Sequence, residues 1–152
     1  MQLFIIAVGK GRASPENTLT KSWLSRLPQG GSLFEVESKF PPGQKRTDDE
    51  SSRLLRTIPD GAALAVLDPR GNDHSSEDLA ALIGAWRDGG FAVACFAIGG
   101  TDGHADVMRQ RAERNISFGR AIWPHMLFRA MLAEQLYRAS SILAGHPYHR
   151  GD

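Results

Sequence analysis

Runs of apolar residues, separated by segments with helical periodicity, constrain the fold of this chain most strongly. Continuous runs occupy residues 3–8, 62–67 and 91–98, with an alternating run at 33–37 and a short one at 116–122. Uninterrupted apolar runs of this length are typical of strands covered on both faces. Their alternation with helical segments predicts an α/β fold: a mainly parallel sheet of five to six strands with helices on both faces.

Local capping signals predict where the helices begin. Ser14 and Pro15 open the first helix, Thr47 and Glu50 have capping-box spacing for a second helix that ends near Ile58, and Ser75 with Asp78 opens a third. Further helices are expected over residues 104–114 and 124–144, the last with an apolar stripe from Phe128 to Leu143. We see no repeat or linker, so one domain is expected over residues 1–152.

Composition excludes several classes of protein. Hydrophobic residues make up 41% and charged residues 23%, which is ordinary for a soluble globular protein. No apolar run approaches the roughly 18 residues of a membrane span, and the first residues read as a strand and not as a signal peptide. The single cysteine, Cys95, fits a reducing cytoplasm and sits in an apolar run, as a small core residue would.

Charge is distributed unevenly along the chain, although the net charge is only +1. Residues 109–152 carry seven arginines against three acids, or +4, whereas residues 1–108 carry 11 basic against 14 acidic residues, or −3. This basic third either faces phosphates or forms solvated helix faces. Arg129 and Arg138 are the arginines of its long helix, and they face RNA or stay solvated.

Two expected strands are followed by unusual loops, Leu67 to Gly71 and Gly99 to Gly103. Ligands of parallel sheets bind beyond the carboxyl ends of the strands, so we expect a pocket there. The glycines either let backbone N–H groups approach a ligand or simply allow a tight strand-to-helix turn. Asp68 either holds a ribose hydroxyl or orients a loop, or it is an exposed carboxylate before a turn proline.

Other chemistries find little support. The five histidines lack the i,i+4 spacing of a helical zinc site and the lone cysteine forms no cluster, so no metal is expected. At the end of the chain, Tyr148, His149 and Arg150 together offer stacking, proton transfer and phosphate binding. Residue patterns alone therefore indicate an α/β domain that binds a nucleotide or a nucleic acid.

Taken together, the motifs resemble the ribosomal large subunit methyltransferase H family of the SPOUT methyltransferases. The resemblance covers nearly the whole chain and is carried by Ala7-Val8-Gly9, Leu67-Asp68 with Gly71, Ile98-Gly99-Gly100 with Gly103, Pro124-His125, Arg129, residues 133–139, Ile142 and residues 146–150. Thr101-Asp102 stands where the family usually has a Pro-Glu-like pair, and Met126 and Gly145 replace a frequent proline and asparagine.

The resemblance implies transfer of a methyl group from S-adenosyl-L-methionine to N3 of pseudouridine1915 in 23S rRNA, on assembled ribosomes in the cytoplasm. It also implies a C-terminal trefoil knot, a homodimer, and no role for a metal or a membrane. Two other activities stay open: a SPOUT methyltransferase acting on a different RNA, and a ribosome-binding module without turnover. A flavodoxin-like nucleotide binder is a further alternative, which gives no reason for the terminal motif.

The same resemblance assigns residues to roles. The cofactor-binding residues it implies are Leu67, Gly99, Gly100, Gly119, Arg120, Ala121, Ile122, Trp123 and Pro124. The catalytic residues it implies are Tyr148, His149 and Arg150, held near the substrate and over the pocket of a partner subunit. His149 is the candidate base that removes the N3 proton, and Arg150 the group that stabilises the resulting anion or holds a phosphate.

Overall fold

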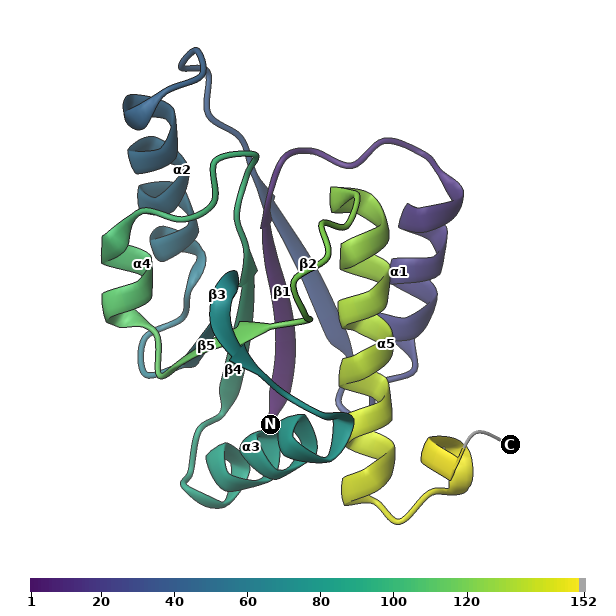
Figure 1. Ribbon diagram of the computed structural model, residues 1–152. Helices are drawn as coiled ribbons and strands as arrows, with labels where there is room; N and C mark the ends of the chain where they lie inside the picture. The colour runs from purple at the N-terminus through teal and green to yellow at the C-terminus, as the bar shows by residue number, and fades with distance from the viewer. Residues whose placement is uncertain (151–152) are drawn as a thin grey trace.

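A single parallel sheet forms the centre of the computed structural model, which describes residues 1–150 (Figure 1). Gly151 and Asp152, included above in the expected domain and the charge count, lie outside the described residues. The sheet has the strand order β2-β1-β4-β3-β5. Its strands are β1 (Gln2–Val8), β2 (Gly31–Val36), β3 (Ala63–Asp73), β4 (Val93–Ile98) and β5 (Arg114–Ser117), and all are parallel.

Five α-helices and one 3-10 helix surround the sheet. They are α1 (Pro15–Ser25), α2 (Gln44–Thr57), α3 (Ser76–Asp88), α4 (Asp106–Arg111), α5 (His125–Leu143) and the 3-10 helix η1 (Pro147–Arg150). Helices α1, α3 and α5 cover one face, and α2 and α4 cover the other (Figure 1). Right-handed crossovers require this division, because the connections through α1 and α3 step one way along the sheet and those through α2 and α4 step the other.

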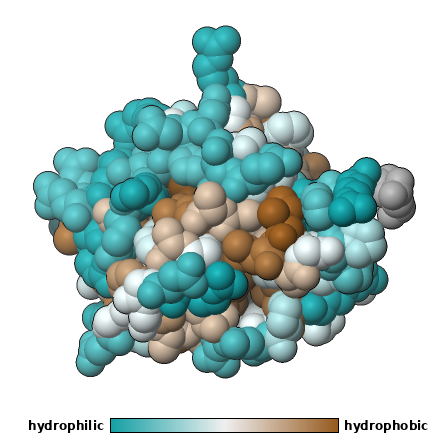
Figure 2. All heavy atoms as spheres, turned by 90° about the horizontal axis from the view of Figure 1, so that it is seen from below, coloured by the Kyte–Doolittle hydropathy of each residue, from teal (hydrophilic) through white to brown (hydrophobic). Residues whose placement is uncertain are grey.

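Alternate residues of each strand enter the two cores. Ile5 and Phe96 pack beneath α1, α3 and α5, whereas Ile6 and Cys95 pack beneath α2 and α4. Cys95 is fully buried, and burial raises the pKa of its thiol to about 11, so its prediction as a core residue is confirmed. At the amino ends of the strands, the surface shows a central apolar patch within a hydrophilic rim (Figure 2).

The expected start of α2 is wrong. The helix begins at Gln44 after the N-cap Gly43, which has no side chain to cap it, and Thr47 and Glu50 lie inside the helix and are buried. The other two caps are confirmed: Ser14 accepts a hydrogen bond from the Asn17 N–H, and Ser75 and Asp78 form a complete capping box.

The expected boundaries of the third and fifth strands are also wrong. β3 continues to Asp73, and β5 ends at Ser117 instead of Ile122. Leu67 and Asn72 both pair with Ile116, so residues 68–71 bulge out of the ladder. A Cβ on Gly71 would lie 2.7 Å from the backbone of Asn115, which explains why glycine is needed there.

Among residues 1–150, no helix is both long and apolar enough to cross a membrane. The trefoil knot stays a prediction, since strand order and helix layering do not define how a chain is threaded.

The capping box of α3 generates a prediction about stability. Ser75→Ala removes the side-chain acceptor for the Asp78 N–H and should lower the free energy of unfolding by about 1 kcal/mol. Ser52→Ala, the same substitution at an exposed position inside α2, should change it by less than about 0.5 kcal/mol. Urea unfolding of both variants measures the difference, and equal effects would contradict a capping role for Ser75.

Candidate functional site

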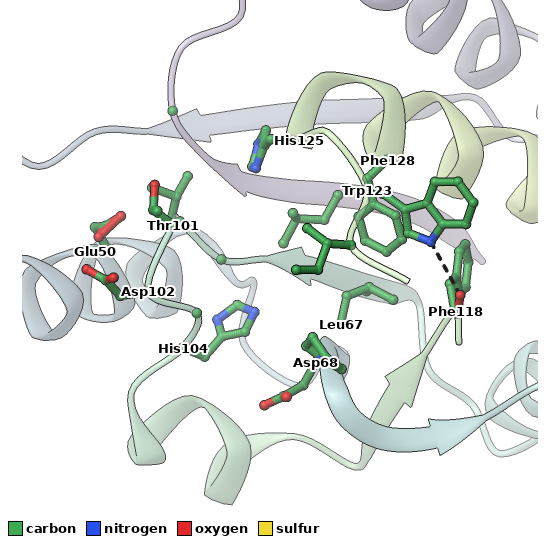
Figure 3. Close-up of a pocket in the computed structure, with 18 of the residues that line it drawn as sticks. Glu50, Leu67, Asp68, Thr101, Asp102, His104, Phe118, Trp123, His125 and Phe128 are labelled. Carbon is green, nitrogen blue, oxygen red and sulfur yellow. Dashed lines mark hydrogen bonds between the residues drawn. The ribbon is translucent and has the colours of Figure 1, made fainter. Parts of the chain in front are cut away.

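A cavity of about 1100 Å³ opens at the carboxyl ends of the strands. Its walls come from the ends of β3, β4 and β5, the start of α5, and the loops after β1 and β2. Carboxylates gather on one side of this cavity, and aromatic rings gather on the other (Figure 3). The pocket expected beyond the strands that end at Leu67 and Ile98 is therefore present.

Backbone packing explains the glycine-rich turn after β4. A Cβ on Gly99 would lie 2.9 Å from the Gly103 carbonyl, and one on Gly100 would collide with the Glu50 carboxylate. Gly103 has a φ of +77° and its N–H donates to the Gly100 carbonyl at 3.0 Å. The interpretation as a tight turn is therefore confirmed. The backbone of the turn also lines the cavity, and its approach to a ligand stays a prediction.

The carboxylates of Glu50, Asp68 and Asp102 make one side of the cavity acidic (Figure 3). Glu50 is 5% exposed, and burial raises the pKa of its carboxyl against the opposing effect of Arg46, whose Nε lies 3.7 Å away. Asp68 is also buried and accepts from Arg109 Nε at 2.6 Å and from the Arg70 N–H at 2.9 Å. Asp68 thus orients the loop after Leu67, as one alternative predicts. The prediction of an exposed carboxylate is wrong, and a contact with a ribose hydroxyl stays a prediction.

Aromatic side chains from the loop before α5 and from α5 itself form the other side. Phe118 and Phe128 pack edge to face with ring centroids 5.2 Å apart, and Trp123 Nε1 donates to the Phe118 carbonyl at 3.4 Å. Ile122, in the same loop, is 96% exposed. A wide apolar slot of this kind suits a planar ring, and the exposed Ile122 extends the apolar surface outward.

Two histidines line the cavity in defined tautomers. His104 Nε2 lies 3.2 Å from the Ala97 carbonyl, which can only accept, so Nε2 carries the proton. Nδ1 is then a buried acceptor with no partner among residues 1–150, and burial lowers the pKa of the ring. His125 Nε2 accepts from Arg129 Nε at 2.9 Å, so its proton lies on Nδ1. Both rings are neutral around pH 7.

Arg129 is 1% exposed and joins three elements beneath the cavity. Its guanidinium donates to the Val8 and Gly9 carbonyls after β1, forms an ion pair with Glu35 of β2, and donates to His125. The prediction that Arg129 faces RNA or solvent is therefore wrong. The periodicity of α5 did not reveal this role, because an arginine at a buried helical position is normally excluded unless it is paired.

The terminal motif lies at the other end of α5 from the cavity (Figure 1). With 19 residues, α5 is about 28 Å long. The Tyr148 ring packs on Tyr137, its hydroxyl donates to Glu134 at 2.9 Å, and the Arg138 guanidinium lies over its face. His149 Nδ1 donates to the His146 carbonyl at 2.6 Å, so Nε2 is the acceptor nitrogen of the neutral ring.

The structure separates the predicted site residues into two groups. The first lines the cavity and comprises Leu67, Gly99, Gly100, Gly119, Ala121, Ile122 and Trp123. Arg120 and Pro124 belong to the same loop but do not line it, and Pro124 is the N-cap of α5. Tyr148, His149 and Arg150 form the second group, which does not reach the cavity of its own chain.

Sequence reasoning missed several lining residues, among them Glu50, Asp102, His104 and Phe118. The sequence indicates a place in the cavity only for Asp102 and His104, because they lie in or beside the glycine turn. Capping-box spacing predicts that Glu50 is a capping residue, and the apolar run over residues 116–122 predicts that Phe118 lies in a strand. Within residues 1–150, no group of three or more histidine, cysteine, aspartate or glutamate side chains is arranged to hold a metal ion.

The fold and the cavity define the general class: an α/β protein with a glycine-lined ligand site at the carboxyl edge of a parallel sheet. Residues 1–149 match the family described as "Predicted SPOUT methyltransferase". The SpoU methyltransferase AviRb from Streptomyces viridochromogenes, solved in complex with the cofactor AdoMet, aligns with a TM-score of 0.44 and 12% identity, covering 91% of this chain and 59% of that chain.

Curated relatives are much more similar. Ribosomal RNA large subunit methyltransferase H of Paramagnetospirillum magneticum is 50% identical over 151 residues, and that of Roseobacter denitrificans is 46% identical over 158 residues. Each alignment covers 99% of this chain and 99% of the relative. The chain belongs to the SPOUT methyltransferases and, within them, to the family of ribosomal RNA large subunit methyltransferase H.

The contact between His125 and Arg129 generates a prediction about pH. Burial and then the Arg129 charge lower the pKa of His125 from 6.5 to about 4, so the unfolded chain binds a proton there before the folded protein does. Titration of His125 should leave the free energy of unfolding unchanged above pH 6.5. It should lower this free energy by about 2–3 kcal/mol as the pH falls to 4.

The test compares His125→Gln, which keeps an oxygen acceptor for Arg129, with His74→Gln, a matched change remote from Arg129. Urea unfolding between pH 7 and 4 should give a shallower loss of stability for His125→Gln than for the wild type. His74→Gln should keep the wild-type slope. Parallel pH profiles for all three proteins would show that His125 is not the group responsible.

Proposed function

We propose that this chain methylates N3 of pseudouridine1915 in 23S rRNA, using S-adenosyl-L-methionine, on the assembled ribosome in the cytoplasm. The observation that carries the proposal is the full-length similarity to ribosomal RNA large subunit methyltransferase H, together with a cavity lined by the glycine turn that the family motif contains. The cavity supplies a cofactor site, and the terminal motif supplies groups for the substrate.

The cavity residues fit S-adenosyl-L-methionine chemically. The apolar and aromatic side formed by Leu67, Phe118 and Phe128 suits adenine, and the glycine turn brings backbone groups close to a ligand. The acidic side suits the hydroxyl, ammonium and sulfonium groups of this cofactor. When bound, the cofactor supplies an activated methyl group, so no metal is required.

Residues of the chain would supply orientation and proton transfer. Methyl transfer is an in-line displacement whose rate depends strongly on positioning. N3 of pseudouridine carries a proton between two carbonyls, and this proton must leave for the nitrogen to attack. The free Nε2 of His149 is an acceptor suited to take it, while the exposed Arg150 stabilises the anion or holds a phosphate.

A homodimer would bring the cavity residues of one copy close to the terminal motif of the other. The terminal motif is remote from its own cavity, so it serves the reaction only by reaching the cavity of a second copy. Apolar residues on the outer side of α1 and near the start of α5 support such pairing: Leu19 is 46% exposed, Leu127 is 38% exposed, and a second cavity of about 710 Å³ lies between the two helices and the loop before α3.

Methylation of a different RNA by the same cavity is the second candidate, since the cofactor residues would serve any RNA substrate equally well. A ribosome-binding module without turnover is less consistent with the preserved glycine turn and terminal motif. These activities differ in substrate and in turnover, so one assay distinguishes them.

The first test is mass analysis of 23S rRNA after incubation of unmodified ribosomes with the protein and S-adenosyl-L-methionine. We expect one new methyl group on a pseudouridine, and none when protein-free rRNA is the substrate. Calorimetry should show that the protein binds the cofactor. Cofactor binding without methylation of ribosomes would favour a different RNA, and absence of cofactor binding would favour the binding module.

A second test addresses His149. His149→Ala should lower the methylation rate by about 10²–10⁴-fold, because the proton at N3 loses its acceptor, while cofactor affinity stays unchanged. A rise of the residual rate with pH would support loss of a base. Ser52→Ala, at an exposed position inside α2 and outside the terminal motif, should keep the wild-type rate. Wild-type turnover by His149→Ala would exclude His149 as the base.

A further inference from the structure

Most arginines of the basic C-terminal third are occupied within the chain. Arg109 pairs with Asp68 and Asp106, Arg111 with Glu113, and Arg138 with Glu134. Arg114 donates to the Glu113 carbonyl, and Arg129 is buried. Residues 109–150 therefore offer few cations to an external phosphate, although their sequence contains the largest excess of positive charge.

A different part of the surface carries cations without acidic partners. The segment after β1, residues 9–15, contains Lys10 and Arg12, and the segment from the end of β2 into α2, residues 38–46, contains Lys39, Lys45 and Arg46. Neither segment contains a carboxylate. Arg46 pairs with Glu50 and Asp102, whereas the other four are exposed and form no ion pair within residues 1–150.

The fold brings both segments to the cavity, and from there the first runs to α1 and the second to α2 (Figure 1). β1 and β2 are neighbours and parallel, so the segments that follow them leave the same edge of the sheet (Figure 1). Lys10, Ser38 and Arg46 line the cavity itself. The basic surface is therefore continuous with the mouth of the cofactor site, which is where a large substrate must rest to present one base.

Local features of the second segment also suit an anionic partner. Helix α2 starts with Lys45 and Arg46 in place of the acidic residues preferred there, and its N-cap has no side-chain hydrogen bond. Phosphate oxygens would accept from its first N–H groups and offset this charge. Phe40 lies between Lys39 and Lys45 in the sequence, is 48% exposed and suits stacking on an unpaired base.

Acidic groups near this surface are few. Glu35 is engaged by Arg129 and the Gly11 N–H, and Asp48 accepts from Gln44. Glu16 lies in the first turn of α1, and Glu37 is an exposed carboxylate at the rim of the cavity. Because Gln44 is uncharged, Asp48 joins Glu16 and Glu37 as a carboxylate without an ion pair within residues 1–150. The four exposed cations outnumber these three carboxylates, which leaves the surface positive.

We propose that Lys10, Arg12, Lys39 and Lys45 form a docking surface for the phosphate backbone of ribosomal RNA, with Phe40 stacking on an unpaired base. The proposal rests on the proposed function, since it names the contact that brings the substrate to the cavity. Single charges on exposed side chains steer and hold an RNA backbone without reading its sequence.

The test measures methylation of ribosomes by Lys39→Ala/Lys45→Ala and by Lys10→Ala/Arg12→Ala. Each pair should raise the KM for ribosomes about tenfold at moderate salt and reduce the salt dependence by about one power of salt concentration per lost cation. Cofactor affinity should not change in Lys39→Ala/Lys45→Ala, because neither residue lines the cavity. Lys39→Arg/Lys45→Arg should restore the KM, because it keeps the charge.

The matched control is Arg56→Ala/Arg87→Ala, which removes two exposed charges at the ends of α2 and α3, by the amino ends of the strands. It should keep the wild-type KM and salt dependence. An unchanged KM and salt dependence in both test pairs, with an active wild type, would overturn the docking surface alone. An inactive wild type on ribosomes would instead contradict the proposed function.

Phe40 is tested separately, because stacking is less sensitive to salt than phosphate contact. Phe40→Ala should raise the KM with little change in salt dependence, and Phe40→Trp should keep it near the wild-type value. Equal KM values for Phe40→Ala and the wild type would remove Phe40 from the surface.

Discussion

The buried guanidinium of Arg129 is the interaction on which the site depends. It fixes the start of α5 to the carboxyl ends of β1 and β2 through two carbonyls, Glu35 and His125. Removing it would leave a partly buried carboxylate and two carbonyls without their donor, and the loss of one partner of a buried ion pair is strongly destabilising. Because residues 118–124 lead directly into α5, the same contact also positions the aromatic side of the cavity.

A parallel sheet then determines where chemistry is possible. All five strands end at one edge, so the loops after β1, β2, β3, β4 and β5 converge there. Within these loops, close backbone contacts and not flexibility explain the glycines: Gly71 lies against β5, Gly99 against Gly103, and Gly100 against Glu50. The cavity thus combines backbone groups, buried carboxylates and aromatic rings at one open site.

The part of the sequence with the largest excess of basic residues is not the part that forms the basic surface of the folded chain. The C-terminal third has the excess of arginines, yet its arginines mostly hold the structure together through Asp68, Glu113, Glu134 and Glu35. The surface available to phosphates comes from Lys10, Arg12, Lys39 and Lys45, which belong to residues 1–108, where the net charge is −3. Ion pairs with carboxylates decide which cations remain available to bind phosphates, and these pairs form only in the folded chain.

The sequence by itself determined the α/β class, the positions of most strands and helices, the caps at Ser14 and Ser75, and the family, because each is written in local spacing or in a contiguous motif. The two cavity loops after Leu67 and Ile98 were also predictable, since strand ends mark them. Only the tertiary structure decided the strand order, the bulge at residues 68–71, the start of α2, the burial of Arg129 and Glu50, and the distance between the cavity and Tyr148 to Arg150. These features depend on contacts between segments far apart in the chain, and such contacts leave no periodic signal in either segment.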